Sequence, residues 1–166
     1  MDGQVRASVA RVLLWFAVIW WGVWFGGQMF NALMVVPHFS AAPPQSLAGW
    51  YQLRYDNLLD FFLTFNALWI FLALALALLV GGRALGGRRK WMAVSALAAL
   101  VATVMLFGWM VRTIVQVVTP DNGLSAAETV RLLRLWTAAN WVRLAIELVG
   151  FVAALKALSA PPLTAP

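Results

Sequence analysis

Several charged and amide side chains lie within long apolar stretches of this chain, and such groups can carry chemistry. Near the C-terminus, Trp136, Asn140, Arg143 and Glu147 are spaced by four, three and four positions. On an α-helix this spacing places all four side chains on one face. A charged group inside a membrane is costly, so it usually faces a partner or a wet cavity and marks a functional site. We therefore expect this face to point inward.

The charges within the apolar stretches balance one another. Arg112 and Arg143 match Asp60 and Glu147 in number, so a cluster of all four would be neutral and less costly to bury. Two interpretations are open. In the first, these groups form ion pairs that hold the helices in register. In the second, Arg112 and Arg143 hold the polar or anionic end of a lipophilic molecule in an outward-opening pocket, while aromatic side chains contact its apolar body.

The pocket hypothesis assigns roles to individual residues. A general base would be Asp60 or Glu147. His38 is the only histidine and follows Pro37, so it is either a third catalytic candidate or an ordinary loop residue. The residues expected to bind the ligand are Asn31, Asn66, Arg112, Trp136, Asn140 and Arg143.

The composition excludes several classes of function. The chain has no cysteine, which excludes disulfides, thiolate metal sites and cysteine nucleophiles. With one histidine, haem held by two histidines of one chain is impossible, and a di-iron carboxylate site lacks enough ligands. We therefore expect no metal and no cofactor. The net charge of +6 is carried at helix ends and in one short loop, so we also expect no nucleic-acid partner.

Hydrophobicity indicates an integral membrane protein. Of 166 residues, 63% are hydrophobic and 11% are charged, which is too much apolar area to bury inside a soluble domain of this size. About 20 apolar residues are needed for a helix to cross the hydrocarbon core. The sequence predicts an all-α, four-helix bundle formed by one membrane domain, residues 1–166, with four spans: 12–36, 58–80, 91–118 and 126–158.

Local signals set the expected ends of these spans. Pro37 is expected to end the first span, and Gly81-Gly82 the second. Residues 38–55 are expected to form an ordered extracytoplasmic loop between the first two helices. Ser125 and Glu128 have the spacing of a capping box, which predicts that the last helix begins near residue 126.

Basic residues predict the orientation of the chain. With four spans, the basic residues at 6 and 11, those in the loop 81–90, and Lys156 fall on one side, which the positive-inside rule makes cytoplasmic. We expect a multi-pass protein of the cell's inner membrane with both termini in the cytoplasm. Arg131 and Arg134 fall on the other side, in the first turns of a helix long enough to project beyond the lipid.

Two parts of the sequence resemble a known family. Residues 26–37, GGQMFNALMVVP, with residues 42–50, APPQSLAGW, resemble the first helix and loop of small four-helix membrane proteins grouped with anthrone oxygenases. Residues 135–143, LWTAANWVR, are similar to the last helix of that group. The resemblance implies a four-helix fold. For the few members with an assigned activity, it implies cofactor-independent oxygenation of a polyketide anthrone to a quinone.

These observations favour one function and leave an alternative. The first is binding, or oxidation without a metal cofactor, of a lipophilic small molecule in the outer half of the bundle, as in an oxygenase-like enzyme. The alternative is an accessory or assembly subunit of a larger membrane complex, which the small size and the tryptophan-rich first helix favour. Membrane lipid is an expected partner in either case, and a homo-oligomer is compatible with both.

Overall fold

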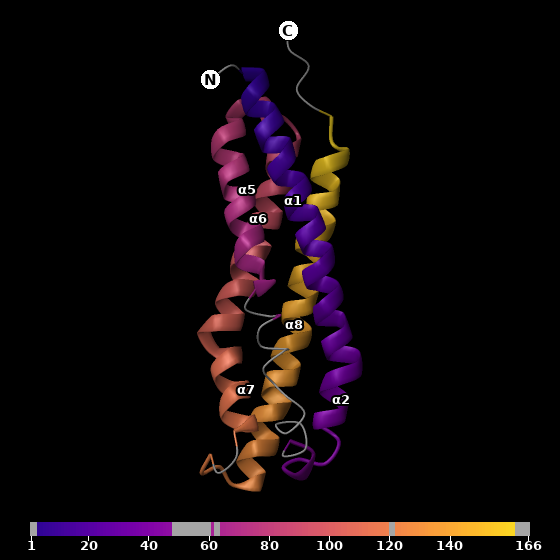
Figure 1. Ribbon diagram of the computed structural model, residues 1–166, viewed down its shortest axis with the longest axis vertical. Coiled ribbons are helices and arrows are strands. Elements are labelled where there is room, and N and C mark those ends of the chain that lie inside the picture. Colours follow the sequence, from indigo (N-terminus) through magenta and orange to yellow (C-terminus); the bar gives the residue numbers. More distant parts are fainter. Residues whose placement is uncertain (1–2, 48–60, 62–63, 120–121, 162–166) are drawn as a thin grey trace.

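The described part of the chain is entirely helical. A computed structural model describes residues 3–47, 61, 64–119 and 122–161, and these residues contain no strand. Figure 1 shows long helices running nearly parallel to the longest axis, with the two chain termini at the same end. This arrangement agrees with the all-α class predicted from the sequence.

The first helix continues past the proline that was expected to end it. Helix α1 covers Gly3–Phe30, a π-helical turn covers Asn31–Val35, and helix α2 covers Val36–Phe39. A proline inside an α-helix removes a hydrogen bond and clashes with the carbonyl four residues earlier. Here the π turn precedes it, and Pro37 occupies the first turn of α2, where a proline is tolerated. The predicted end at Pro37 is therefore wrong, and the helix ends at Phe39.

The second predicted span is interrupted just before helix α5. Helix α5 covers Ala67–Gly81, and its N-cap is Asn66, whose backbone is extended and whose side-chain oxygen accepts a hydrogen bond from the backbone N–H of Leu68 at 3.0 Å. This cap interrupts the span predicted from residue 58, although residues 58–60 lie outside the described part. The predicted end is confirmed, because Gly82 follows with a φ of +51°. A 3₁₀ turn, Gly82–Leu85, then leads to the next helix.

The third and fourth helices agree with the sequence more closely. Helix α6 covers Arg88–Met105, a π turn covers Leu106–Met110, and helix α7 covers Val111–Val118. Helix α8 covers Ala126–Ser159, and both hydrogen bonds of the predicted capping box between Ser125 and Glu128 are present. This reciprocal cap explains why α8 begins where the sequence predicted.

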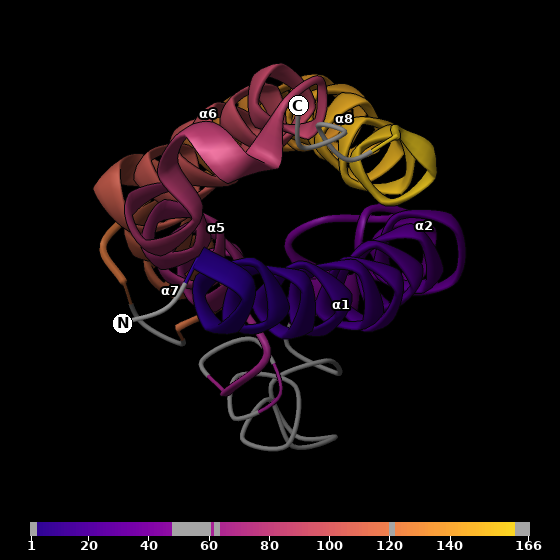
Figure 2. The same cartoon turned by 90° about the horizontal axis from the view of Figure 1, so that it is seen from above.

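The helices close into a ring around a common interior. Helix α1 packs against α5 and α8, and α6 packs against the same two helices. Figure 2, which looks along the long axis, shows α1 and α6 on opposite sides of this ring. Helix α5 extends only along the half of the molecule nearest the termini (Figure 1), so α7, α8 and α2 form much of the other half.

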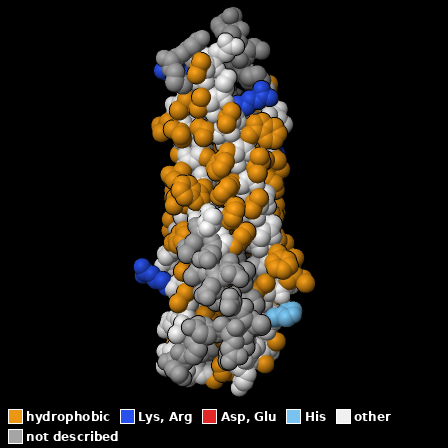
Figure 3. Space-filling model, in the orientation of Figure 1, with side chains coloured by type: hydrophobic (Ala, Val, Ile, Leu, Met, Phe, Trp, Pro, Cys, Tyr) orange, Lys and Arg blue, Asp and Glu red, His pale blue; other side chains and the backbone are white. Residues whose placement is uncertain are grey.

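Three segments of the described chain are long and apolar enough to cross a membrane. They are Gly3–Phe39, Ala67–Leu85 and Arg88–Val118. Helix α8 is not among these three segments. Much of the surface of these segments is apolar: Figure 3 shows hydrophobic side chains over the face between two levels at which Lys and Arg appear.

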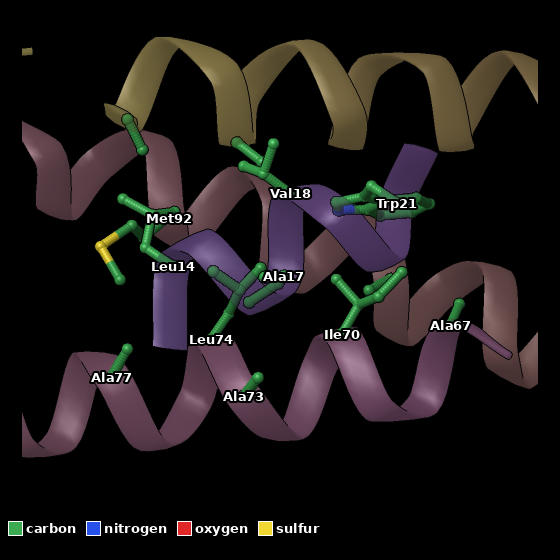
Figure 4. Packing of buried hydrophobic residues seen from close by; sticks show 14 of the residues in the cluster. Leu14, Ala17, Val18, Trp21, Ala67, Ile70, Ala73, Leu74, Ala77 and Met92 are labelled. Atoms are coloured by element: carbon green, nitrogen blue, oxygen red, sulfur yellow. The ribbon is translucent and has the colours of Figure 1, made fainter. Parts of the chain in front are cut away.

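Small and aromatic side chains fill the half of the ring nearest the termini. Trp21 is fully buried, and its indole N–H donates to the hydroxyl of Ser95 at 2.9 Å. Figure 4 shows Leu14, Ala17 and Trp21 of α1 beside Ile70 and Leu74 of α5. Alanine on α5 and α6 lets the helix backbones approach closely.

A second cluster fills the other half, where α2, α7 and the start of α8 meet. It contains Phe39, Met110, Val117, Leu133 and Trp136. Loop residues 40–47 lie beside it, and Ser46 secures them by donating to the carbonyl oxygen of Phe39 at 2.6 Å. The rest of the predicted loop, residues 48–55, lies outside the described part.

Candidate functional site

A layer of polar side chains lies at the centre of the ring. Arg143 and Glu147 form an ion pair, with 3.2 Å between Nη1 and Oε1. The other terminal nitrogen of Arg143, Nη2, donates to the side-chain oxygens of Gln28, at 2.5 Å, and Asn140, at 2.7 Å. The indole N–H of Trp24 donates to Glu147 Oε1 at 2.9 Å. All five residues are at most 1% exposed. We refer to these five residues as the polar layer.

The polar layer joins two helices that are far apart in the sequence. Asn140, Arg143 and Glu147 occupy one face of α8, and Trp24 and Gln28 are one turn apart on α1. The guanidinium carbon of Arg143 also lies 5.7 Å from the centroid of the Trp24 ring, within range of a cation–π contact. Opposite charges and donated hydrogen bonds together offset the cost of burial, so the layer holds α1 against α8 at a fixed register.

The hydrogen bonds of the polar layer are not all satisfied. Within the described part of the chain, Arg143 Nε and Glu147 Oε2 are buried without a hydrogen-bond partner, and Arg143 Nη1 has only its ion pair with Glu147 Oε1. Each such atom carries a desolvation cost. Because these atoms are sealed from the surface, a lipophilic molecule cannot reach them without opening the α1–α8 contact. In this structure the layer connects helices and does not form an open pocket.

The predicted site residues on α8 are thus brought together, and Trp136 lies one turn farther along the same face. Its indole N–H donates to the backbone carbonyl oxygen of Met110 at 3.0 Å. The side chain is buried between α8 and the π turn that follows α6. Trp136 therefore connects two helices and lies beside the polar layer without being part of it.

The remaining predicted site residues that the structure describes are not among the five residues of the polar layer. Arg112 is exposed on α7, and His38 is exposed on α2. Asn31 is buried in the π turn before α2, and Asn66 caps α5. Asp60 lies outside the described part of the chain. Arg112 is exposed, so the structure does not bring it together with Arg143 and Glu147.

Sequence reasoning did not include Gln28 and Trp24 in the site. Their spacing of four positions on α1 was the available signal, because it places an amide and an indole N–H on one helix face. Which residues of α8 face them depends on how the two helices are aligned along their length. That alignment is a tertiary property that a single sequence does not state.

A groove lies between α2 and α8, on the side of the polar layer that faces away from the termini. Its volume is about 700 Å³. Its lining is mostly apolar, and Arg134 is the only charged residue among the described residues that line it. The lining residues are Ala32, Val36, Pro37, Ser40, Ala41, Pro43, Val130, Leu133, Arg134, Thr137, Ala138 and Trp141. We refer to this feature as the outer groove.

The outer groove has the form of a site for an amphiphilic molecule. Arg134 and Trp141 are both exposed and lie seven positions apart on α8, which is about 10 Å along a helix at about 1.5 Å per residue. A cationic end and an aromatic end separated by this distance can contact two parts of one elongated ligand. The described residues contain no group of three or more histidine, cysteine, aspartate or glutamate side chains that could hold a metal ion.

We compared the chain with protein families, curated sequences and solved structures. No protein-family model, no curated protein sequence and no solved structure matches the chain.

Proposed function

We propose that the chain is an integral membrane four-helix bundle in which α8 is the fourth span. Lys156 Nζ lies 4.6 Å from the centroid of the Trp91 ring, a pairing typical of a membrane interface. Twenty positions separate Lys156 from Trp136, which is about 30 Å of helix and matches the hydrocarbon core. The polar layer then lies inside the membrane, where its internal pairing makes the buried charges tolerable.

The basic residues support one orientation for this bundle. Arg11, Arg83, Arg88 and Lys156 belong to the end that carries both termini. The positive-inside rule places that end in the cytoplasm, and we propose the inner membrane of the cell as the location. The first turns of α8 then project beyond the outer surface, and Arg134 lies at that surface. The loop after α2 is extracytoplasmic in this orientation.

We further propose that the outer groove binds a lipophilic small molecule with an anionic end. The observation that carries this proposal is the mostly apolar lining, in which Arg134 is the one charged residue among those that the structure describes. With Trp136 at the outer interface, Arg134 lies in the headgroup region and Trp141 faces the hydrocarbon. An amphiphilic ligand therefore has its charge beside Arg134 and its apolar body beside Trp141, without burying an unpaired charge.

The resemblance to anthrone oxygenases suggests an aromatic ligand and an oxidation of it. Oxidation without a cofactor requires a base that removes a proton from the ligand, so that the resulting carbanion can be oxidised by dioxygen, which is reduced in turn. Glu147 is sealed within the polar layer, so it does not reach the outer groove. His38 is exposed on α2 and is adjacent to Pro37, which lines the groove. We propose His38 as the base if the ligand is oxidised.

Binding of two fluorescent probes tests the groove. 1-Anilinonaphthalene-8-sulfonate is anionic, and N-phenyl-1-naphthylamine is a neutral relative of similar shape. In phosphatidylcholine nanodiscs we expect Arg134→Gln to weaken binding of the anionic probe about fivefold, because one charge contact of about 1 kcal/mol is lost. Binding of the neutral probe should be unchanged. Fluorescence titration against empty nanodiscs measures both.

Arg112→Gln is the matched control, since Arg112 is exposed on α7 and lies outside the groove. Equal losses in both variants would show a general charge effect and would contradict the groove. Native mass spectrometry of the purified protein, with an absorption spectrum, adds an independent observation. A bound aromatic molecule would support the ligand proposal, whereas a second protein at fixed stoichiometry would favour the accessory-subunit alternative.

A further inference from the structure

The end of the molecule that carries the termini has a concentration of basic side chains. Arg83, Arg88, Arg89 and Lys90 lie in and after the turn between α5 and α6, with Arg11 on α1 and Lys156 on α8. The described carboxylates, Glu128 and Glu147, lie in the first turn and the middle of α8. No described acidic residue therefore neutralises this end, and it attracts anions.

Two of these arginines line a small crevice between helices. The crevice has a volume of about 50 Å³ and lies where α1 meets the 3₁₀ turn and the start of α6. Its inner wall is formed by buried apolar side chains, among them Leu14, Leu85 and Met92. Arg11 and Arg88 are the charged residues that line it. The crevice thus combines an apolar wall with two guanidinium groups.

Arg88 is held in position for an anion. Its Nε donates to the backbone carbonyl oxygen of Ala160 at 2.7 Å, which connects the start of α6 to the end of α8. Its terminal nitrogens make no ion pair with a described residue. Arg88 is also the first residue of α6, whose N-cap, Gly87, has no side-chain cap. The positive end of the helix dipole therefore adds to the charge of the two arginines.

We propose that this crevice binds the phosphate of an anionic phospholipid from the cytoplasmic leaflet. Guanidinium groups bind phosphate oxygens through paired hydrogen bonds, and basic pockets between membrane helices bind acidic lipid headgroups. The phosphate lies between Arg11 and Arg88, and the acyl chains extend along the apolar outer surface of α1. This site rests on the proposed membrane arrangement but is independent of the outer groove.

Lipid retention in nanodiscs tests the site. The protein is placed in phosphatidylcholine nanodiscs with and without phosphatidylglycerol, and native mass spectrometry measures which lipid stays bound. We expect the protein to retain phosphatidylglycerol in preference to phosphatidylcholine. Arg11→Gln and Arg88→Gln should each lower this preference about fivefold, and the double variant about 25-fold, because each arginine contributes separately to binding of the anionic headgroup.

Arg89→Gln is the control variant, because Arg89 is exposed, carries the same charge and is adjacent to Arg88 but does not line the crevice. A loss in Arg89→Gln equal to that in Arg88→Gln would overturn the site in favour of general surface charge. Circular dichroism verifies that each variant remains helical, and Arg88→Lys should retain part of the preference. Binding of the anionic naphthalene probe at the outer groove should be unchanged, which separates this site from the proposed function.

A second arm separates a lipid from a soluble anion. Inorganic phosphate added to the phosphatidylglycerol nanodiscs should leave the bound lipid in place, because it lacks acyl chains and gains no contact with the apolar outer surface of α1. Complete displacement by inorganic phosphate would overturn the lipid assignment and show an anion site. Equal retention of phosphatidylglycerol and phosphatidylcholine by the unaltered protein would overturn the proposal entirely.

Discussion

Replacing Arg143 with methionine should lower the free energy of unfolding by about 3–5 kcal/mol, because Glu147 then remains as a buried charge without its partner. Glu147→Met should have an effect of similar size, since it leaves Arg143 buried beside the Gln28 and Asn140 oxygens alone. Each single substitution fills the space with an apolar side chain, so the loss reflects charge rather than a cavity. Unfolding by dodecyl sulfate, followed by circular dichroism in mild detergent, measures the effect.

The double variant Arg143→Met with Glu147→Met should recover most of this stability. Replacing both members of a buried ion pair with apolar groups of similar volume is often neutral or stabilising. The coupling between the two substitutions therefore isolates the ion pair from the rest of the polar layer. Arg112→Met is the matched control, because Arg112 is exposed, and it should change stability by no more than about 0.5 kcal/mol. Additive losses in the double variant would contradict the ion pair.

Replacing Gly150 with valine should lower the free energy of unfolding by about 3 kcal/mol. A Cβ at position 150 would lie 2.6 Å from the Trp21 ring and 2.8 Å from the Cβ of Ala98, both closer than side-chain carbons approach. Neither neighbour can move away easily. The Trp21 ring is fully buried, and Ala98 is buried on α6, where its Cβ is fixed by the helix backbone. Overpacking of this kind costs about 1–3 kcal/mol, and valine adds two further methyl groups.

Gly26 provides the control for this substitution. A Cβ at position 26 would have no atom within 4 Å, so Gly26→Val should change stability by less than about 1 kcal/mol. The same unfolding measurement applies to both variants. If the two variants lose equal stability, glycine's effect on helix propensity explains the result, and the close approach of α8 to Trp21 is contradicted.

The sequence predicted the features that depend on neighbouring residues. The hydrophobic composition and the long apolar stretches indicated helices, and the capping box located the start of α8 correctly. The spacing of Asn140, Arg143 and Glu147 correctly placed these side chains on one inward face. Each of these signals lies within one helix or at its start. Each can therefore be interpreted without knowing which helices are neighbours in the fold.

The features that the sequence did not predict depend on contacts between segments or on local backbone changes. Pro37 was expected to end a helix, but the π turn before it allows the helix to continue. Arg112 was expected inside and lies on the surface of α7, where Thr113 and Val117 are the buried neighbours. Neither π turn has a composition that distinguishes it from the α-helix around it.

These positions favour the first interpretation of the buried charges over the second. Arg143 and Glu147 form a pair with each other and with α1, as expected for groups that hold helices in register. The proposed ligand site is therefore moved to the outer groove, where Arg134 is exposed. In this account α8 contributes both to the sealed polar layer and to the outer groove, which we propose as the binding surface.

The proposal that α8 crosses the membrane is tested most directly by cysteine labelling, and the chain has no cysteine that would interfere. Ala127→Cys and Ser159→Cys place single thiols at the two ends of α8, where both positions are exposed. A membrane-impermeant maleimide should label position 127 in cells with a permeabilised outer envelope and an intact inner membrane. It should label position 159 only after the inner membrane is lysed. Labelling of both positions before lysis, or of neither, would contradict a fourth span and the orientation proposed for the outer groove.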